Sequence, residues 1–330
     1  MRTRPAGRGG LTVTELSFGA AQIGNLFTAM TGEQASGAVD AAWSAGVRCF
    51  DTAPHYGVGL SERRLGAALA RRSRDEFVVS TKVGRLLVPD PEGASGNDTE
   101  GFDVPATWRR VRDYSRDGVL RSLDDSMARL GLSRVDIAFV HDPDNHYRRA
   151  LDGAFPALEQ LRQEGVIISY GAGMNQSAML AEFVRHTDLD IVMLAGRYTL
   201  LEQGALDDLL PLCLERRVSV IAAGVFNSGL LANGRPAPGA RYNYAPAPAA
   251  LLYRASQIAS ICERFGTTLP ATAAQFPLAH PAVANVCLGM RSREQVRRNA
   301  ALFETPIPVG LWSALKSEGL LREDAPTLGA

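Results

Sequence analysis

The chain has 330 residues, and its 35 basic and 35 acidic side chains give a formal charge of zero. Balanced charge argues against a nucleic-acid-binding surface, which usually carries an excess of Lys and Arg. A hydrophobic fraction of 46% with 21% charged residues is typical of a packed globular protein and excludes wholesale disorder. There is no apolar run of about 18 residues or more, which argues against a membrane span.

The four cysteines, Cys49, Cys213, Cys262 and Cys287, lie far apart and include no C-x-x-C pair. This spacing argues against a disulfide framework and against a cysteine-based zinc site. The N-terminal segment lacks the apolar core of a signal peptide. We therefore expect a cytoplasmic protein.

Short, continuously apolar runs rich in β-branched residues recur along the chain, as in strands that are buried on both faces. They predict strands at 16–19, 47–51, 77–82, 135–141, 166–171, 191–194, 218–223 and 284–289. Amphipathic segments predict helices at 33–45, 61–72, 107–130, 155–163, 177–186, 205–216, 249–265 and 293–302. Thr31 and Ser61 are the expected N-caps of the first two helices.

Eight strands alternating with eight helices predict an α/β fold, a parallel (β/α)8 TIM barrel formed by residues 1–330 as a single domain. The alternative is a doubly wound open sheet, which needs a glycine-rich phosphate turn after its first strand. The segment FGAAQIGN at 18–25 matches G-x-G-x-x-G poorly. A further strand at 11–13 is expected to form part of a hairpin that plugs the barrel floor.

Three segments do not fit the alternation and are expected to be irregular: 84–105, 227–248 and the tail from 304 to 330, which has a short helical patch at 312–317. The first two follow the third and seventh predicted strands. A barrel places its active-site loops at these ends of its strands, so we expect both segments to border the site.

Three predicted strands end in an ionisable residue, namely Asp51, Lys82 and His141. Burying such a group costs several kcal/mol unless it is paired. Because all strands of a parallel barrel point to one mouth, these three side chains should meet there. Tyr56, on the loop after Asp51, should join them.

An acid, a base, a phenol and an imidazole in one cleft suit proton transfer to or from an oxygen atom. The unperturbed pKa of a tyrosine is about 10, and an adjacent Lys82 ammonium should lower the pKa of Tyr56. Asp51 should hold Lys82 charged and oriented, while His141 donates a hydrogen bond to a carbonyl oxygen. No serine or cysteine stands at a comparable strand end, so the expected partner in the chemistry is a nicotinamide cofactor.

Motifs around these residues follow one another in a fixed order. They are D-T-A-P-H-Y-G at 51–57, G-x-S-E-x-x-L-G at 59–66, S-T-K at 80–82, V-H at 140–141, G-A-G-M-N-Q at 171–176, F-N-S-G-L-L at 226–231 and G-M-R-S-R-E-Q-V-R-R-N at 289–299. In these motifs the chain closely resembles the aldo-keto reductases. The resemblance implies a barrel that binds a nicotinamide dinucleotide, with Asp51, Tyr56, Lys82 and His141 as catalytic tetrad and Tyr56 as general acid or base.

H-D-P-D at 141–144, L-A-G-R-Y-T-L-L at 194–201 and G-V-F-N-S-G-L-L at 224–231 resemble the branch that includes D-threo-aldose and L-fucose 1-dehydrogenases. This resemblance implies oxidation of a cyclic hemiacetal to its lactone, with a small-molecule substrate and no nucleic-acid or membrane partner. Other activities of the same family remain as alternatives, namely a pyridoxal 4-dehydrogenase or a general aldehyde reductase. A monomer or small homo-oligomer is expected.

The resemblance also implies a set of cofactor contacts: Asp51, Asn175, Phe226, Asn227, Gly229, Leu230, Arg291, Ser292, Gln295 and Asn299. Ala195 and Ala223 replace a glutamine and a stacking tyrosine that are usual in the family, and Phe226 is expected to substitute for the tyrosine. Arg291 and Ser292 are expected at the adenosine ribose or a 2′-phosphate, and Asn299 at the adenine. Gln295 stands where strong NADP binders have an arginine, which favours NAD over NADP.

Two functions of other classes remain as alternatives. One is an NADP-binding regulatory subunit, against which the intact tetrad speaks. The other is a metal-dependent barrel hydrolase or lyase, because His141, Asp142, Asp144 and His146 offer four possible ligands. Pro143 interrupts this segment, so we expect no metal site.

Overall fold

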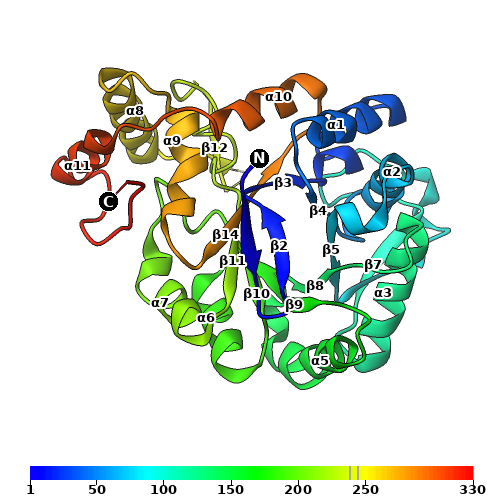
Figure 1. Ribbon diagram of the computed structural model, residues 1–330. Coiled ribbons are helices and arrows are strands. Elements are labelled where there is room, and N and C mark those ends of the chain that lie inside the picture. Colours follow the sequence, from blue (N-terminus) through cyan, green and yellow to red (C-terminus); the bar gives the residue numbers. More distant parts are fainter. Residues whose placement is uncertain (238, 244, 330) are drawn as a thin grey trace.

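The computed structural model describes residues 1–237, 239–243 and 245–329, and its strands close into a parallel barrel. Figure 1 shows the strands as an inner ring with helices around it. In chain order the barrel strands are β3 (Leu16–Gly19), β4 (Cys49–Asp51), β5 (Val78–Val83), β8 (Ile137–His141), β9 (Ser169–Met174), β10 (Ile191–Ala195), β11 (Ser219–Ala223) and β14 (Val283–Gly289). Each strand pairs with the next, and β14 closes the ring against β3. The predicted (β/α)8 barrel is therefore confirmed.

Helices connect and cover the strands. They are α1 (Gly32–Ser44), α2 (Leu60–Leu69), α3 (Arg116–Leu130), α4 (Tyr147–Arg149), α5 (Phe155–Gln163), α6 (Ser177–His186), α7 (Leu209–Arg216), α8 (Ala249–Arg264), α9 (Leu269–Gln275), α10 (Arg293–Leu302) and α11 (Val309–Ser317). Thr31 caps α1 as predicted, because its hydroxyl accepts from the Gln34 N–H at 3.1 Å and the Gln34 side chain accepts from the Thr31 N–H at 2.8 Å. None of the described helices is long and apolar enough to cross a membrane.

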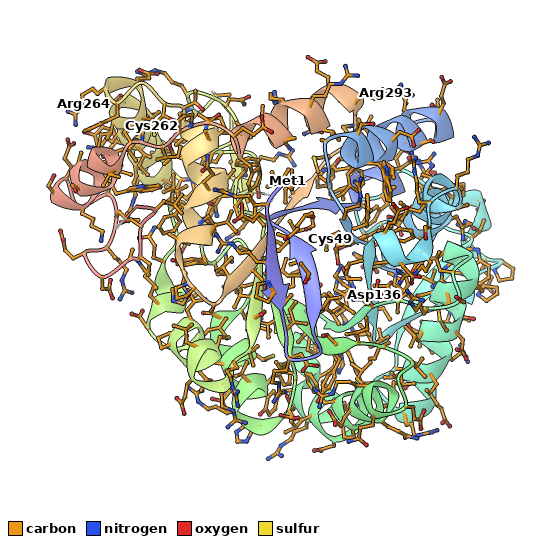
Figure 2. All side chains as sticks on the ribbon, in the orientation of Figure 1. Met1, Cys49, Asp136, Cys262, Arg264 and Arg293 are labelled. Carbon is orange, nitrogen blue, oxygen red and sulfur yellow. The ribbon has the colours of Figure 1, made fainter. Side chains whose placement is uncertain are left out.

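The predicted hairpin plugs the floor of the barrel. β1 (Thr3–Ala6) pairs antiparallel with β2 (Leu11–Thr14), and in Figure 1 the pair lies across the ring. The hairpin side chains Ala6, Leu11 and Val13 are buried in one cluster with side chains from several barrel strands, Cys49 among them. Figure 2 shows Cys49 within the ring of strands. The hairpin thus closes the N-terminal end of the barrel and leaves its C-terminal end for the site.

The segment after β5 differs from its prediction. Residues 84–105 are not wholly irregular, and 107–130 is not one helix. Instead β6 (Arg85–Pro89) and β7 (Trp108–Arg112) form an antiparallel pair, which we name the β6–β7 ribbon. The helix α3 begins only after Ser115, whose hydroxyl accepts from the Gly118 N–H.

The reason for this difference is tertiary. Leu86 and Leu87 of the ribbon are buried, whereas the sequence around 108 carries an apolar spacing that also suits a helix. Packing against a partner strand distant in the sequence overrides that local preference.

Two other predicted boundaries are wrong for local reasons. Ser61 is not the N-cap of α2: the helix starts behind Gly59, at a φ of 82°, and the Ser61 hydroxyl donates to the Ala20 carbonyl at 2.8 Å. The strand predicted at 166–171 is β9, displaced toward the C-terminus. Ile167 is buried in the core before the sheet begins, so the apolar run starts earlier than the strand does.

The C-terminal third contains further differences. The helix predicted at 205–216 is a 3-10 turn (Gly204–Leu206) followed by α7, which begins behind Asp208. The short helix α9 is not predicted at all, and α11 begins three residues before the predicted patch. Within 227–248, β12 (Arg241–Tyr242) pairs with β13 (Ala245–Pro246). Positions 238 and 244 of that segment, and the final position 330 of the predicted domain, lie outside the described residues.

Candidate active site

Asp51 and Lys82 form a buried ion pair at the C-terminal ends of β4 and β5. The Lys82 Nζ donates to Asp51 Oδ1 at 2.9 Å and Oδ2 at 2.7 Å, and to the Thr52 carbonyl at 2.9 Å. The Ser80 hydroxyl donates to Asp51 Oδ1 at 2.7 Å. Because Asp51 is 4% and Lys82 2% exposed, the hydrogen bonds replace lost solvation and hold the ammonium in one place.

Tyr56 lies beside this pair on the loop after β4. The centroid of its ring is 4.8 Å from Lys82 Nζ. It meets the His141 ring edge-on, with the ring centroids 5.9 Å apart. His141, at the end of β8, is buried, whereas Tyr56 keeps part of its surface exposed. The structure therefore brings together the four side chains that the sequence predicted, and Tyr56 is the least buried residue of the four.

Two glycines fix the loop that carries Tyr56. Gly57 has a φ of 61°, and a Cβ built on it would lie 2.2 Å from the Gly24 carbonyl oxygen. A Cβ on Gly24 would lie 2.8 Å from the carbonyl oxygen of Tyr56. Only residues without side chains can approach so closely. The 3-10 turn (Gln22–Gly24) after β3 thus supports the backbone of Tyr56 directly.

Burial and Lys82 act in opposite directions on Tyr56. Burial raises the pKa of Tyr56 and the Lys82 ammonium lowers it, with the net pKa at about 12. The predicted effect of Lys82 is therefore present, but burial outweighs it. For Lys82 itself, burial favours the neutral form, but the Asp51 carboxylate, by its charge and its hydrogen bonds, more than offsets this, so the pKa of Lys82 lies above its ordinary value. At neutral pH the site holds a protonated phenol beside a charged ammonium.

His141 is a neutral imidazole. Burial lowers the pKa of His141 well below its usual range, and the nearby Arg85 cation lowers it further. His55, whose ring centroid is 5.5 Å from that of His141, has its pKa lowered to about 2 for the same reasons. A neutral imidazole has one N–H donor. His141 can therefore offer a hydrogen bond to an oxygen without adding a second cation beside Lys82.

The loop of the β6–β7 ribbon borders the site, as predicted for the segment 84–105, although the sequence did not single out the residues that form this wall. Phe102 packs against Tyr56, with the ring centroids 6.1 Å apart, and against His55 at 5.2 Å. Arg110 of β7 donates to the His55 carbonyl at 2.9 Å and lies against the Phe102 ring. The short apolar run 86–88, bounded by a glycine and a proline, was the available strand signal.

Five of the predicted cofactor contacts lie on the loops after β9 and β11. Asn175 directly follows β9 and is exposed. On the loop after β11, Phe226 is half-buried, Gly229 is exposed, and Asn227 and Leu230 are buried. The Asn227 Nδ2 donates to the Gly196 carbonyl at 3.3 Å, but its buried Oδ1 accepts no hydrogen bond from the described residues.

Apart from Asp51 at the end of β4, the remaining predicted contacts lie on α10 or just before it, after β14. The Ser292 hydroxyl accepts from the Gln295 N–H at 3.1 Å, and Gln295 Oε1 accepts from the Arg291 N–H at 2.9 Å. Both side chains are therefore engaged in capping α10. Asn299 is buried on the same helix, and Figure 2 shows the neighbouring Arg293 at the outside of the molecule.

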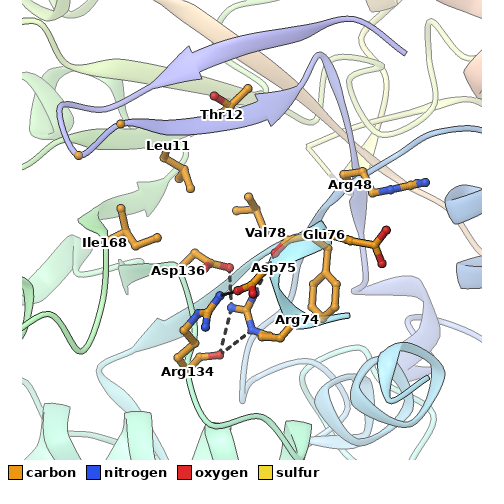
Figure 3. Close-up of a pocket in the computed structure, with 13 residues that line it drawn as sticks. Leu11, Thr12, Arg48, Arg74, Asp75, Glu76, Val78, Arg134, Asp136 and Ile168 are labelled. Atoms are coloured by element: carbon orange, nitrogen blue, oxygen red, sulfur yellow. Dashed lines mark hydrogen bonds and ion pairs between the residues drawn. The ribbon is translucent and has the colours of Figure 1, made fainter. Parts of the chain in front are cut away.

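A pocket at the opposite end of the barrel is not part of this site (Figure 3). Its lining includes Asp136, which precedes β8, and the turn of the floor hairpin. Four of its charged side chains form two pairs: Arg74 Nη2 lies 2.6 Å from Asp136 Oδ2, and Arg134 pairs with Asp75. In a barrel, residues at this end contribute to stability.

The segment weighed as a metal site does not assemble one. His141, Asp142, Asp144 and His146 are all described, and no three of them, alone or with other described side chains, gather into a set that could hold a metal ion.

Comparison with known proteins agrees with the fold. The family model of the Aldo/keto reductase family matches residues 15–317. The chain is 48% identical over 323 residues to D-threo-aldose 1-dehydrogenase from Pseudomonas sp, with 97% of this chain and 98% of that protein covered. It is 41% identical over 335 residues to pyridoxal 4-dehydrogenase from Microbacterium luteolum, with 96% and 97% covered.

A solved structure agrees as well. The holo form of an aldo-keto reductase from Bacillus halodurans superposes with a TM-score of 0.75 at 27% identity, covering 98% of this chain and 99% of that one. Both the match to the family model and the identity to the two relatives extend over nearly the whole chain. The chain therefore belongs to the aldo/keto reductase family of oxidoreductases.

Proposed function

We propose that this enzyme oxidises the anomeric hydroxyl of a cyclic hemiacetal, such as a D-threo-aldose or L-fucose, to the lactone, with NAD or NADP as oxidant. The observation that carries the proposal is that the Tyr56 ring lies beside both the charged Lys82 and the neutral His141. Similarity to a D-threo-aldose 1-dehydrogenase over nearly the whole chain supports the substrate class.

The loops after β9, β11 and β14 fit a dinucleotide. The buried Asn227 Oδ1 lacks a donor among the described residues, and the exposed Asn175 amide stands at the rim. We propose that Asn175 and Phe226 hold the nicotinamide, and that Asn227, Gly229 and Leu230 line its path. The capped N-terminus of α10, formed by Arg291, Ser292 and Gln295, suits the adenosine end, and Asn299 lies further along the same helix. When bound, the cofactor accepts the hydride that leaves the anomeric carbon.

Side chains of the protein remove the proton of the anomeric hydroxyl and stabilise the groups involved. The Tyr56 phenolate removes the proton of the anomeric hydroxyl, and the neutral His141 donates a hydrogen bond to the same oxygen. Lys82 stabilises the phenolate by its charge, and Asp51 fixes Lys82. The substrate loses one proton to Tyr56 and one hydride, and the hemiacetal carbon becomes the lactone carbonyl. In the reverse direction Tyr56, which is protonated at neutral pH, is the proton donor.

Pyridoxal is the second candidate substrate, because it also forms a cyclic hemiacetal and the chain is 41% identical to a pyridoxal 4-dehydrogenase. We further propose that NAD is preferred, since Gln295 offers no cation to a 2′-phosphate. The enzyme is expected to work in the cytoplasm as a monomer or small homo-oligomer.

A spectrophotometric panel of aldoses and pyridoxal, each with NAD and with NADP, tests the proposal by following absorbance of the reduced cofactor. We expect turnover of an aldose with release of the lactone, and none with Tyr56→Phe under the same conditions. Turnover restricted to simple aldehydes, or none with any hemiacetal, would contradict it.

A further inference from the structure

A chain of three side chains leads from the β6–β7 ribbon to the catalytic imidazole. Arg85 Nη2 donates to Asp142 Oδ2 at 2.6 Å, and the same carboxylate oxygen lies 3.5 Å from His141 Nε2. Arg85 is 8% and His141 6% exposed, whereas the Asp142 side chain between them is 37% exposed, so the contact is buried at both ends and reaches solvent at the carboxylate. The ribbon therefore places a cation behind the carboxylate that faces His141.

The backbone at Asp142 is held for this contact. Asp142 has a φ of 40°, a left-handed conformation that a residue other than glycine keeps only when the surrounding structure holds it there. Its N–H donates to the Gly173 carbonyl at 3.0 Å, which ties the turn after β8 to β9. The left-handed backbone and this hydrogen bond together hold the Asp142 side chain in one direction, toward His141.

The imidazole has no other polar anchor in the described structure. The buried His141 Nδ1 lacks a hydrogen-bond partner, so no contact there decides which nitrogen carries the proton. At 3.5 Å the Asp142 oxygen is beyond ordinary hydrogen-bond distance from Nε2 and acts mainly by its charge. A negative charge attracts an N–H and repels a lone pair.

We propose that Asp142 and Arg85 are positioning residues for His141: Asp142 directs the imidazole proton to Nε2, and Arg85 masks the carboxylate so that the imidazole stays neutral. The proposal rests on the proposed function, in which His141 donates a hydrogen bond to the substrate oxygen. It adds two residues that touch neither substrate nor cofactor in that scheme.

Every charge around the imidazole is consistent with this division of roles. Arg85, Lys82, His55 and Arg112 all act on His141 in the direction of the neutral form, and Tyr56 meets its ring. Asp142 is the carboxylate in contact with it. Without Arg85, that carboxylate would face the imidazole unmasked and favour an imidazolium, which would place a second positive charge near Lys82.

The test is NMR of the protein labelled with nitrogen-15 at its histidines, of which there are five, with His141→Gln to assign the signal. In the wild type we expect the neutral Nε2–H form down to pH 5. In Arg85→Met, the titration midpoint of His141 should rise by about 1–3 pH units, because a neighbouring charge shifts a pKa by that amount. Adding Asp142→Asn to that variant should reverse the rise, since the carboxylate causes it.

Arg74→Met is the matched control, because it breaks an Arg–Asp pair of the same 2.6 Å length at the far end of the barrel. It should leave the His141 signal unchanged. Equal midpoints in the wild type and Arg85→Met, or a rise that persists with Asp142→Asn, would overturn the proposal. If Arg85→Met fails to fold, Asp142→Asn provides the test by itself, because Asn has nearly the same shape as Asp but no charge. In Asp142→Asn, we expect His141 to be a mixture of the Nε2–H and Nδ1–H tautomers. A His141 that remains entirely in the Nε2–H tautomer would overturn the proposal.

Kinetics separate this proposal from the proposed function. Asp142→Asn should lower kcat for hemiacetal oxidation about tenfold or more with little change in KM, because it weakens a hydrogen bond to the reacting oxygen. If the wild type oxidises a hemiacetal but the variants lack the expected NMR changes, the role of Arg85 and Asp142 is wrong and the proposed function stands. The expected NMR changes in a protein that oxidises no hemiacetal would instead remove the proposed function.

Discussion

Lys82 donates hydrogen bonds to both carboxylate oxygens of Asp51, at 2.9 and 2.7 Å, while its Nζ lies 4.8 Å from the ring centroid of Tyr56. Replacing such a buried pair with apolar residues is often neutral or stabilising, so burial of the pair is poorly explained by stability. Its position is explained by Tyr56, because a fixed ammonium is the group that lowers the cost of forming the phenolate.

Removing the phenol should abolish most turnover. Tyr56→Phe lacks the group that accepts the proton, and general acid–base catalysis contributes about 10²–10⁴-fold, so kcat should fall at least about 100-fold. Binding of the reduced cofactor, followed by its fluorescence, should be retained. Tyr253→Phe is the control, since Tyr253 is exposed on α8. Near-normal turnover of Tyr56→Phe would exclude Tyr56 from the proton step.

The rate of oxidation should rise with pH and depend on Lys82. Oxidation needs the phenolate, and the pKa of Tyr56 is about 12, so below that pH the phenolate fraction grows about tenfold per pH unit. Lys82→Met removes the charge that lowers the pKa of Tyr56. The alkaline limb of the pH–rate profile should therefore move to higher pH in this variant. Lys316→Met removes the other lysine of the chain, which is half-buried on α11 and donates to the Glu323 carbonyl, and should leave the profile in place. An unmoved limb in Lys82→Met would contradict the role of the ammonium.

Acid should destabilise the fold partly through His55. The pKa of His55 is about 2 in the folded protein against 6.5 as the ordinary value, so between these pH values only the unfolded chain binds a proton there. The free energy of unfolding must therefore fall as pH falls below about 6.5. Urea unfolding at pH 7 and pH 4.5 should show a smaller loss for His55→Gln than for the wild type. An equal loss would mean that His55 is not held neutral.

Gly66 should tolerate no side chain. A Cβ built on it would lie 1.9 Å from the Leu130 carbonyl oxygen, where α2 crosses the end of α3. Gly66→Ala must displace this contact, and we expect a loss of about 1–3 kcal/mol in the free energy of unfolding. Thermal unfolding of both variants measures this loss. Gly32→Ala, where a Cβ meets nothing within 4 Å, should leave the free energy of unfolding unchanged or raise it slightly. A Gly66→Ala protein as stable as the wild type would show that the helices move apart easily.

Replacing Gln295 with arginine should shift the cofactor preference from NAD toward NADP. Gln295→Arg would place a guanidinium at the N-terminus of α10 and should improve the ratio of NADP to NAD in kcat/KM about tenfold, because a bidentate Arg–phosphate contact is strong. Gln295→Met loses the same hydrogen bond to the Arg291 N–H without adding charge, so it should bring no such gain. An equal change in both variants would attribute the preference to the cap of α10.

The barrel and its tetrad could be predicted from the sequence because their signals are local or periodic. Buried parallel strands appear as short apolar runs, and Asp51, Lys82 and His141 stand at the ends of three such runs. Parallel topology then converts three separated positions into neighbours at one mouth. The residues of the loops follow no such rule, so the cofactor contacts came from the resemblance alone.

The sequence by itself determined the order of the barrel strands, the four side chains proposed as catalytic and the family of the chain, because strand periodicity and motif spacing can be read along the sequence. Only the tertiary structure decided that 108–112 is a strand, that Phe102 lies against Tyr56 and that Arg85 stands behind Asp142. Such pairings join residues far apart in the sequence. The net pKa of Tyr56 was decided there too, because burial depends on everything that packs around the phenol.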